Sequence, residues 1–424
     1  MNRSSRSRPA PPLFSRARAS VRRVARGLLP EPLRRRYHGY ALQRDFGIDR
    51  KSGVRTRFPL DRSLSRGVNL VGWFGSPTGI GQSARALARA AESAGLPVSR
   101  IEAGHLDAGG AAPAPHAVNL FHVNADGAAS IVQLCGPSVH RGHSNVGYWY
   151  WETEDFPRRW RDRFAYFDEI WVASEFCRAS IARESAIPVV VVAPPVILEI
   201  PPHAVFASPP EAGESFRFLT VCDADSVPER KNPLGAVRAF SRAFSGDGSV
   251  SLTVRVANAG NASGLLLELQ AAARGARVDI DTRPLDRGGI ERLLAGCDAY
   301  VSLHRSEGFG LPIAEAMALG KPVVATAYSG PRDFLDETTG YPIRWKPVVQ
   351  KAALPPYPAG TRWAEPDEEH AADSLSRIVA DRAEASRRGE AGRKRIESIY
   401  GLAAAGRRVA DRVDGLLARL ARKP

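Results

Sequence analysis

Cysteine is scarce in this sequence, and the few cysteines present are scattered. The 424 residues include four cysteines, at positions 135, 177, 222 and 297, and no two of them form a Cys-x-x-Cys pair. Zinc sites and redox motifs usually contain such pairs, and disulfide scaffolds need many cysteines in a short chain. We therefore expect four reduced and buried thiols, since isolated cysteines usually pack as small apolar side chains.

Long hydrophobic runs are absent as well. No stretch approaches the roughly 18 uninterrupted apolar residues of a membrane-spanning helix. The Arg-rich N-terminus lacks the apolar centre of a secretory signal peptide. We therefore expect a cytoplasmic protein. A chain of 424 residues exceeds the length at which one core stops growing, so two domains are expected.

Most of the chain also lacks net charge. The sequence has 59 Lys and Arg residues against 45 Asp and Glu residues, a net charge of +14. Residues 1–66 hold 18 basic and four acidic residues, which leaves 41 residues of each sign for the rest of the chain. A basic surface on the folded domains would be typical of nucleic-acid binding. Here the excess is confined to the tail, so no specific nucleic-acid partner is expected.

The basic tail carries one apolar stripe. Apolar residues recur among arginines at spacings of three and four: Phe14, Ala17, Val21, Val24 and Leu28. This spacing is typical of a helix with one apolar face. Such a helix suits an anionic membrane surface, so residues 1–60 are a candidate for peripheral attachment to the inner face of the plasma membrane. The alternative is a solvated or disordered basic arm, or one that binds nucleic acid nonspecifically.

From residue 67 on, strand, turn and helix alternate. One series runs from VNLVGWF (68–74) to VVVVAPPV (189–196), and a second runs from FRFLTV (216–221) to PVVATA (322–327). Strands separated by helices predict parallel sheets that are covered by helices. The predicted fold class is therefore α/β, with two Rossmann-like doubly wound domains that face each other across a cleft, followed by C-terminal helices.

These patterns divide the chain into five parts. We predict a basic, partly helical or disordered tail (1–66), an N-terminal domain (67–198), a Pro-rich linker (199–215), a C-terminal domain (216–385) and C-terminal helices (386–424) that are candidates for crossing back to the first domain. Doubly wound sheets bind ligands at the carboxyl ends of their strands. The functional site is therefore expected in the cleft.

The stretch RSEGFGLPIAEAMALG (305–320) places two glutamates around the start of a predicted helix. Glu307 lies in the turn before the helix and Glu315 lies about one turn into it. Gly308 and Gly310 permit close approach of the backbone, and a helix start offers free N–H groups. Two carboxylates beside such groups suit the hydroxyls of a sugar or a ribose. The alternative is a helix cap at Glu307 and a surface side chain at Glu315.

Two cations follow the first strand of the second domain. Arg230 and Lys231 lie in VCDADSVPERKNPLGAV, between that strand and the next helix. Adjacent cations at this edge of a sheet fit a pyrophosphate, and a solvated pair is the alternative. Asp223 with Asp225 is the Asp-x-Asp candidate in a strand-end loop, and Lys231 can supply the charge that a divalent ion would. We therefore expect no metal and no cofactor.

Further residues are candidates for contact with a sugar or an acceptor. They are Gly79 and Gly81 in the Gly-rich turn GSPTGIG, His122, Trp149 and Glu152 after strands of the first domain, and His304 and Arg305 before the glutamate motif. The turn does not match a G-x-G-x-x-G fingerprint. Packing in the core explains His122 and the tryptophans equally well.

Together these segments resemble one family. SEGFGLPIAEAMALGKPVVAT (306–326) resembles the Glu-x7-Glu signature of the retaining GT-B glycosyltransferases of family four, and ERKNPLGAV resembles their diphosphate-binding segment. GYWYWETEDFPRRW (147–160) resembles a bacterial branch of that family that acts on polysaccharides and glycolipids. The similarity covers about residues 67–385.

The resemblance implies a metal-independent, retaining transfer of a hexose or deoxyhexose. The donor would be a nucleotide-diphosphate sugar, and the acceptor would be a glycan or a lipid-linked glycan in the synthesis of cell-envelope polysaccharide. The implied roles are Glu307 on the transferred sugar, Arg230 and Lys231 on the diphosphate, Glu315 on the ribose, and Gly308, Phe309, Gly310 and Leu311 in donor binding.

Two other functions remain open from the sequence. A noncatalytic subunit that binds a nucleotide sugar would need the same binding groups. A dinucleotide oxidoreductase would share the fold, although the Gly-rich turn lacks the fingerprint spacing and no obvious ribose-binding acid follows it.

Overall fold

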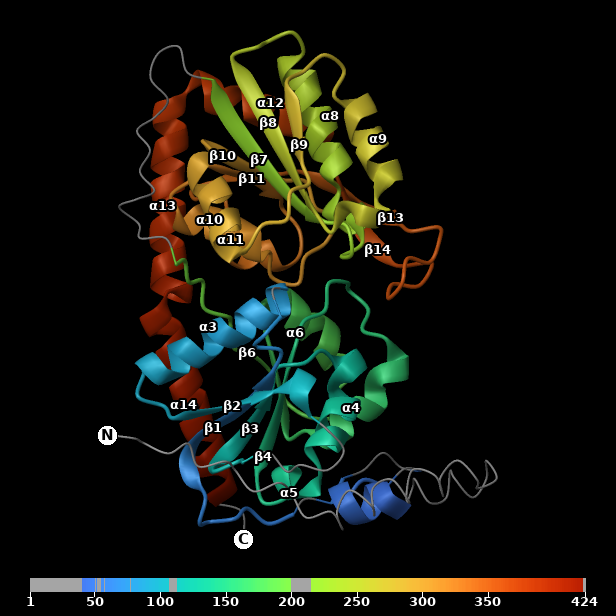
Figure 1. Ribbon diagram of the computed structural model, residues 1–424, viewed down its shortest axis with the longest axis vertical. Helices are drawn as coiled ribbons and strands as arrows, with labels where there is room; N and C mark the ends of the chain where they lie inside the picture. Colours follow the sequence, from blue (N-terminus) through green and yellow to red (C-terminus); the bar gives the residue numbers. More distant parts are fainter. Residues whose placement is uncertain are drawn as a thin grey trace, which may run out of the picture.

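Two parallel sheets of six strands each form the framework of the protein (Figure 1). The computed structural model describes residues 40–49, 51, 55–56, 58–76, 78–106, 113–199 and 215–421. The predicted apolar stripe of the tail and almost all of the predicted linker (199–215) lie outside these described residues.

The first sheet has the strand order β2-β1-β3-β4-β5-β6. Its strands are β1 (Ser65–Gly72), β2 (Val98–Glu102), β3 (His116–Phe121), β4 (Ser144–Trp149), β5 (Glu169–Val172) and β6 (Val189–Val191). Its helices are α3 (Gly79–Ser93), α4 (Ala125–Cys135), α5 (Pro137–His140) and α6 (Glu175–Ala182). Adjacent residues of β1 such as Leu70 and Val71 are both buried, which is typical of a parallel sheet with helices on both faces.

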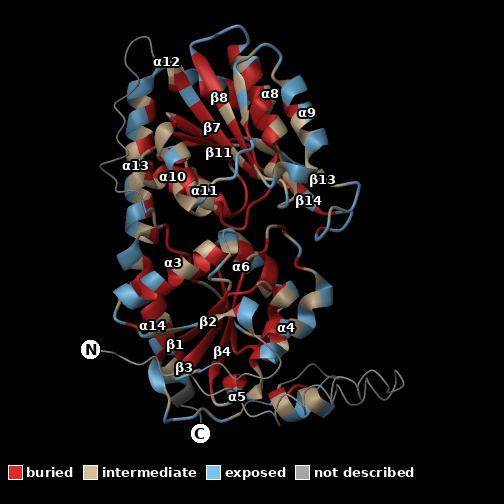
Figure 2. Cartoon of the chain, in the orientation of Figure 1, coloured by how far each residue is buried: buried red, intermediate tan, exposed pale blue. Residues whose placement is uncertain are grey.

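The second sheet has the strand order β12-β11-β10-β7-β8-β9. Its strands are β7 (Phe216–Asp223), β8 (Val250–Ala257), β9 (Val278–Asp281), β10 (Ala299–Ser302), β11 (Val323–Thr326) and β12 (Tyr341–Ile343). Its helices are α7 (Pro228–Lys231), α8 (Pro233–Phe244), α9 (Ser263–Ala272), α10 (Arg287–Gly296), α11 (Leu311–Ala318) and α12 (Glu368–Ala380). Figure 2 shows buried residues along the strands of both sheets. The predicted α/β fold with two Rossmann-like domains is confirmed.

The last two helices connect the domains. Helix α13 (Arg382–Tyr400) runs along the second domain, and α14 (Leu402–Ala421) packs against α3 of the first domain (Figure 1). Val413 of α14 is buried in the same apolar cluster as Leu87 of α3. The carboxylate of Glu169, which is fully buried, accepts hydrogen bonds from Arg412 (2.6 Å) and Arg419 (2.7 Å) of α14. Helix α14 therefore completes the core of the first domain.

Part of the predicted tail also belongs to that core. A short helix spans residues 40–46, and Phe46 and Ile48 are buried in the first domain. Farther along, Arg55 Nη2 lies 3.1 Å from Asp168 Oδ1 in a buried ion pair. Contacts with the first domain therefore begin well before β1.

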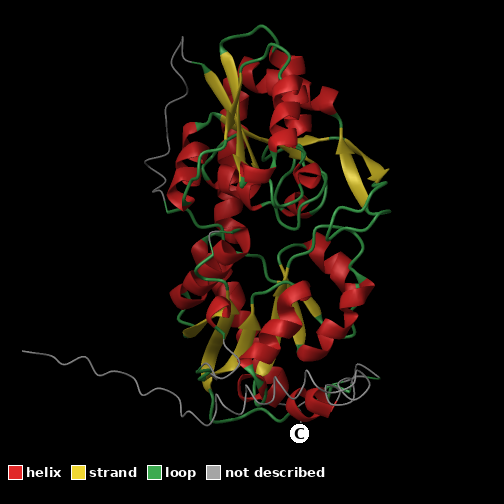
Figure 3. Cartoon of the chain, turned by 45° about the vertical axis from the view of Figure 1, so that its right-hand side comes forward, coloured by secondary structure: helices red, strands yellow, loops and turns green. Residues whose placement is uncertain are grey.

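An antiparallel hairpin that the sequence patterns did not predict extends from the second domain. It consists of β13 (Trp345–Val349) and β14 (Arg362–Pro366), and Figure 3 shows it at the edge of that domain. The ring of Tyr357, in the loop between the two strands, packs against Trp151 of the first domain with 5.4 Å between ring centroids. The hairpin is thus a second bridge between the domains.

Two expectations about membrane spans and thiols can be compared with the structure. No helix in the described part of the chain has both the length and the apolar composition that crossing a membrane requires. All four cysteines are buried and none forms a disulfide, as expected.

Candidate active site between the two domains

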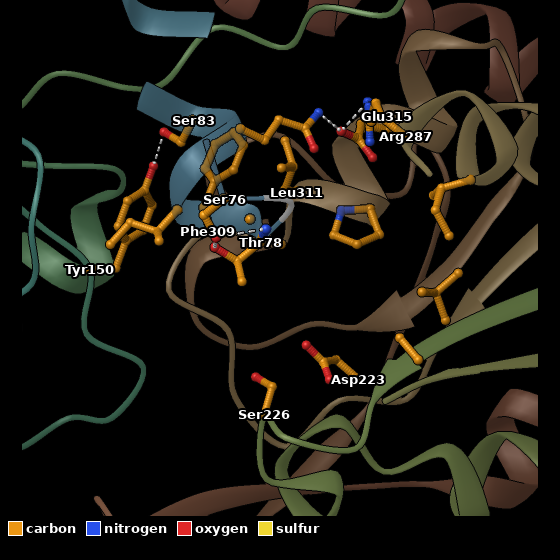
Figure 4. A pocket seen from close by; sticks show the side chains of 18 of the residues that line it. Ser76, Thr78, Ser83, Tyr150, Asp223, Ser226, Arg287, Phe309, Leu311 and Glu315 are labelled. Carbon is orange, nitrogen blue, oxygen red and sulfur yellow. Dashed lines mark hydrogen bonds and ion pairs between the residues drawn. The ribbon is translucent and has the colours of Figure 1, made fainter. Parts of the chain in front are cut away.

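A cavity of about 1010 Å³ lies between the two domains. The first domain contributes the loop after β1 and the start of α3, and the second contributes the ends of β7, β8 and β9 and the turn before α11 (Figure 4). In the second sheet the chain order reverses between β7 and β10, and ligands of doubly wound sheets bind at such a switch point. The cavity is large enough for a ligand of several rings.

Glu307, Arg230 and Lys231 form one cluster on the cavity wall. The Lys231 ammonium pairs with Glu307 Oε1, and Arg230 Nη1 lies 3.2 Å from Glu307 Oε2. The guanidinium of Arg230 is fixed by Ser306 O (2.8 Å) and by Ser226 Oγ (3.0 Å). Arg230 is only 3% exposed, so the alternative of a solvated pair does not describe it.

The four-residue helix α7 that carries both cations is held at each end by a residue in the left-handed region. Val227 has φ 52° and Asn232 has φ 51°. The Asn232 side chain accepts a hydrogen bond from the Gly235 N–H and donates one to Leu303 O (2.8 Å), at the end of β10. A left-handed valine costs free energy and persists only where the surroundings fix it. This geometry ties α7 to the strand that leads to Glu307.

The electrostatics of the cluster keep Glu307 ionised. Burial by itself would raise the pKa of Glu307, but the charges of Lys231 and Arg230 outweigh burial and bring this pKa down to about 2. One carboxylate therefore sits between two cations at neutral pH. The cluster retains net positive charge, which suits an anionic ligand.

Glu315 lies in a second polar cluster. It is 2% exposed, which rules out the alternative of a surface side chain. Arg287 Nη2 lies 2.7 Å from Glu315 Oε1 (Figure 4), and the Gln82 amide of α3 reaches the same oxygen across the cavity over 3.2 Å. Burial raises the pKa of Glu315, and Arg287 opposes that rise. The guanidinium also pairs with Glu291 Oε1 (2.8 Å).

The predicted donor-binding turn borders the cavity. Gly308, Phe309, Gly310 and Leu311 all line it. Gly310 has φ 87°, a conformation that favours glycine, and directs the chain into α11. The start of α11 consequently faces the cavity.

The prediction of one Gly-rich turn over residues 75–81 is wrong at its end. Helix α3 already begins at Gly79, and Thr78 occupies the N-cap position in an extended conformation. Gly79 lines the cavity and Gly81 does not. A Cβ atom on Gly81 would lie 2.5 Å from both Ser76 O and Trp73 O, so this glycine permits the loop to pack on the helix.

His122 and Trp149 lie in the core instead of lining the cavity. His122 is fully buried and its Nε2 lies 3.0 Å from Ser83 Oγ, which in turn lies 2.6 Å from the Tyr150 hydroxyl. Burial lowers the pKa of His122 to about 4. Ser83 and Tyr150 line the cavity (Figure 4), so His122 supports that wall from behind. Trp149 is fully buried among aromatic rings, and the packing alternative therefore holds for both residues.

Of the remaining candidates for contact with a sugar or an acceptor, one lines the cavity and two do not. His304 is fully buried with its Nε2 3.2 Å from Tyr328 O, and Arg305 pairs with Glu365 of β14 (2.8 Å). Neither residue lines the cavity, because both point toward their own domain. Glu152 does line it and accepts a hydrogen bond from the Tyr357 hydroxyl over 2.9 Å.

Several lining residues were missed by sequence reasoning. They are Gln82, Ser83, Tyr150, Arg255 and Arg287. The sequence does contain a signal for Arg287, because it begins a helix that follows a strand. Asp286, just before it, caps that helix by accepting a hydrogen bond from the Gly289 N–H (2.7 Å). Within the described ranges, no group of three or more His, Cys, Asp and Glu side chains could hold a metal ion.

Comparison with known proteins identifies the family. Residues 174–409 match the family described as Family 4 Glycosyltransferase in conflict systems. No curated protein matches the sequence.

Several solved structures share the fold at low sequence identity. Sucrose-phosphate synthase from Thermosynechococcus elongatus matches with a TM-score of 0.60 and 17% identity over 84% of this chain and 100% of that chain. HepE from Anabaena, in complex with UDP and glucose, matches with a TM-score of 0.58 and 12% identity over 82% of this chain and 100% of that chain. A mutant of TarM from S. aureus matches with a TM-score of 0.51 and 14% identity over 72% of this chain and 55% of that chain, so this chain spans about half the length of TarM.

The family match covers more than half of the chain, and the two facing Rossmann-like domains are those of the GT-B fold. The protein therefore belongs to the family 4 glycosyltransferases of conflict systems.

Proposed function

We propose that this protein is a retaining glycosyltransferase that moves a hexose or deoxyhexose from a nucleotide-diphosphate sugar to a glycan or a lipid-linked glycan. We further propose that it acts in the synthesis of cell-envelope polysaccharide. The observation that carries the proposal is the cluster in which Lys231 and Arg230 meet Glu307 on the wall of the interdomain cavity.

This cluster suits the breaking of a sugar–phosphate bond. Lys231 and Arg230 would neutralise the charge that develops on the departing diphosphate, and the start of α11 would add its free N–H groups. Glu307 would accept a hydrogen bond from a hydroxyl of the transferred sugar. Glu315 would accept hydrogen bonds from the ribose hydroxyls at the other cluster.

We propose that the transfer needs no metal. The two cations beside Glu307 supply positive charge where a divalent ion would otherwise act. The absence of a suitable ligand group among the described side chains supports this proposal.

UDP-glucose is the first donor to test. HepE was solved with UDP and glucose, and the TarM mutant was solved with UDP. The choice of sugar depends on single pocket contacts, which are worth about 1–3 kcal/mol each.

The proposal is tested by following the nucleotide and the sugar. Thermal-shift screening with UDP, GDP, ADP and TDP sugars selects the donor, and nucleotide release is then measured with and without a cell-envelope extract. We expect acceptor-dependent release with retention at the anomeric carbon. Glu307→Ala and Lys231→Ala should abolish the transfer, whereas Lys346→Ala, which changes an exposed lysine of β13, should not.

Two results would contradict this function. Donor binding without release in any fraction would favour a noncatalytic nucleotide-sugar-binding subunit. Tight binding of a nicotinamide cofactor in place of a sugar nucleotide would favour an oxidoreductase.

A further inference from the structure

Glu152 of the first domain lies against the turn that carries Glu307. The Ser306 hydroxyl donates a hydrogen bond to Glu152 O. A Cβ atom on Gly308 would lie 3.4 Å from Trp151 O and 3.7 Å from Glu152 Cγ, which are ordinary contact distances, so the two segments pack side by side. Glu152 therefore approaches the end of the cavity where Glu307 and its cations lie.

The carboxylate of Glu152 differs from the other two glutamates of the cavity. Glu307 is paired with two cations and Glu315 with one. Within the described part of the chain, Glu152 has no ion pair, and its Oε1 has no hydrogen-bond partner in the protein. Its Oε2 accepts a hydrogen bond from the Tyr357 hydroxyl over 2.9 Å. One carboxylate oxygen thus remains available to a ligand in the cavity.

Tyr357 reaches Glu152 from the opposite domain. It lies in the loop of the β13–β14 hairpin, is 4% exposed, and packs between Trp151 (5.4 Å between ring centroids) and Trp363 (6.0 Å). Burial, followed by the nearby Glu152 carboxylate, raises the pKa of Tyr357, so its phenol keeps its proton and remains the donor. The hairpin therefore fixes the orientation of the Glu152 carboxylate.

We infer that Glu152 binds the acceptor: its Oε1 accepts a hydrogen bond from the hydroxyl that receives the sugar, and Tyr357 is the positioning residue that orients it. This inference rests on the proposed function, since it assigns the second substrate of the same site. A hydrogen bond to a carboxylate is roughly twice as strong as one between neutral groups, and it directs the hydroxyl oxygen toward the bond that breaks.

The inference also defines the chemical class of the acceptor. A carboxylate without an ion pair repels a phosphate or carboxylate placed next to the reacting hydroxyl, and Arg230, whose charge acts on Glu152, is already paired with Glu307. We therefore expect an uncharged sugar at the reacting end of the acceptor, such as a neutral hexoside.

The test separates acceptor binding from donor binding. Glu152→Gln, Glu152→Ala and Tyr357→Phe are prepared in the full chain, with UDP-glucose or the donor selected above. Three quantities are measured: UDP affinity by calorimetry, nucleotide release to water without acceptor, and transfer to a panel of p-nitrophenyl hexosides.

Glu154→Gln is a matched control. Glu154 lies two residues farther on and makes the same kind of bond to the opposite domain, because its Oε1 accepts from the Tyr328 hydroxyl over 3.0 Å. It does not line the cavity. Glu154 also pairs with Arg362 of the opposite domain over 3.1 Å, so an effect that comes from lost interdomain contact alone should be at least as large in Glu154→Gln as in Glu152→Gln.

We expect Glu152→Gln to lower transfer about 10- to 100-fold, mainly through the KM for the acceptor, since a charged hydrogen bond becomes neutral. UDP affinity should stay within about twofold, Tyr357→Phe should show a smaller loss of transfer, and Glu154→Gln should show none.

Three results would overturn the inference. Unchanged transfer by Glu152→Gln and Glu152→Ala would show that this carboxylate does not bind the acceptor. A parallel loss of UDP affinity and thermal stability, shared with Glu154→Gln, would show an interdomain tether instead. A wild-type protein that releases nucleotide from no donor would reject the proposed function itself, and this inference with it.

Discussion

The Arg287 guanidinium links two buried carboxylates: it lies 2.7 Å from Glu315 Oε1 and 2.8 Å from Glu291 Oε1. Glu315 is 2% exposed and Glu291 is fully buried. Removal of one partner from a buried ion pair is strongly destabilising because a charge is left in a low-dielectric environment. We expect Arg287→Ala to lower the free energy of unfolding by about 3 kcal/mol. Urea denaturation measures this loss.

The loss in Arg287→Ala should also depend on pH. Burial already holds the pKa of Glu315 above its ordinary value, and loss of Arg287 raises this pKa further. A raised carboxyl pKa contributes stability below the unfolded pKa of about 4.3, and that contribution disappears as pH rises through the folded pKa. The deficit should therefore be larger at about pH 7 than at about pH 4.5. Arg292→Ala, on the exposed side of α10, is the control, and equal deficits at both pH values would contradict the assignment.

Lys231→Ala should impair transfer much more than folding. Arg230 lies 3.2 Å from Glu307, so the carboxylate keeps a cation in this variant and the free energy of unfolding should fall less than in Arg287→Ala. Loss of one preorganised group that stabilises a developing charge typically costs about 10²- to 10³-fold in rate. Steady-state nucleotide release measures the rate. A variant that loses much of its free energy of unfolding but keeps its rate of nucleotide release would contradict a mainly catalytic role for Lys231.

Glu307→Gln should change the response of the fold to acid. The pKa of Glu307 is held at about 2 by Lys231 and Arg230 despite burial. A lowered carboxyl pKa contributes stability above the unfolded pKa of about 4.3 that is lost as pH falls through the folded value. The unfolding free energy of the variant should therefore fall less steeply than that of the wild type between about pH 5 and pH 2. Identical slopes would mean that Glu307 is not ion-paired in solution.

Two glycines at the start of α3 should respond differently to alanine. A Cβ atom on Gly81 would lie 2.5 Å from two backbone oxygens, so Gly81→Ala should destabilise the protein by about 1–3 kcal/mol. A Cβ atom on Gly79 meets nothing within 4 Å, so Gly79→Ala should be neutral or stabilise by up to about 1 kcal/mol. Thermal unfolding of the pair tests the register of α3. Equal effects would mean that the helix does not begin at Gly79.

The basic tail should attach the protein to anionic membranes. Each Arg near such a surface contributes about 1 kcal/mol, and the stripe from Phe14 to Leu28 adds apolar contact. Deletion of residues 1–39 should move the protein from the pellet to the supernatant in sedimentation with anionic liposomes. The deletion stops there because Phe46 and Ile48 are buried in the first domain.

A double variant separates charge from apolar contact in the tail. Val21→Ser with Val24→Ser keeps every arginine and removes the middle of the stripe. Neutral liposomes serve as the control surface. An unchanged pellet fraction after the deletion would refute membrane attachment through the tail.

The fold could be predicted because its signals are local. Runs such as EIWV in β5 and the Ala-rich stretch of α11 each carry their own periodicity, and strands alternating with helices have few possible topologies. The β13–β14 hairpin gave no such signal, since each of its strands contains a proline. Helix ends were harder to predict, as at Gly79, where glycines and the preceding proline suggested a longer turn than the structure has.

The site could be predicted best where motif residues stand at strand ends or at the start of the helix that follows. Glu307, Arg230 and Lys231 follow β10 and β7, neighbouring strands of one sheet, so the topology brings them together. Trp149 and His304 were misplaced because a residue at a strand end can point to either side of the chain. Gln82 and Tyr357 could not be predicted as site residues. Each contacts a residue of the opposite domain, and no local sequence pattern indicates which residues of two domains lie close together.

Helix α14 has a consequence for biosynthesis. Its residues complete the core of a domain whose strands are translated some 200–350 positions earlier, and Glu169 lacks Arg412 and Arg419 as partners until that helix is made. A ribosome therefore releases the second domain while the first still exposes the apolar surface of α3. The nascent chain must keep that surface from aggregating until α14 docks.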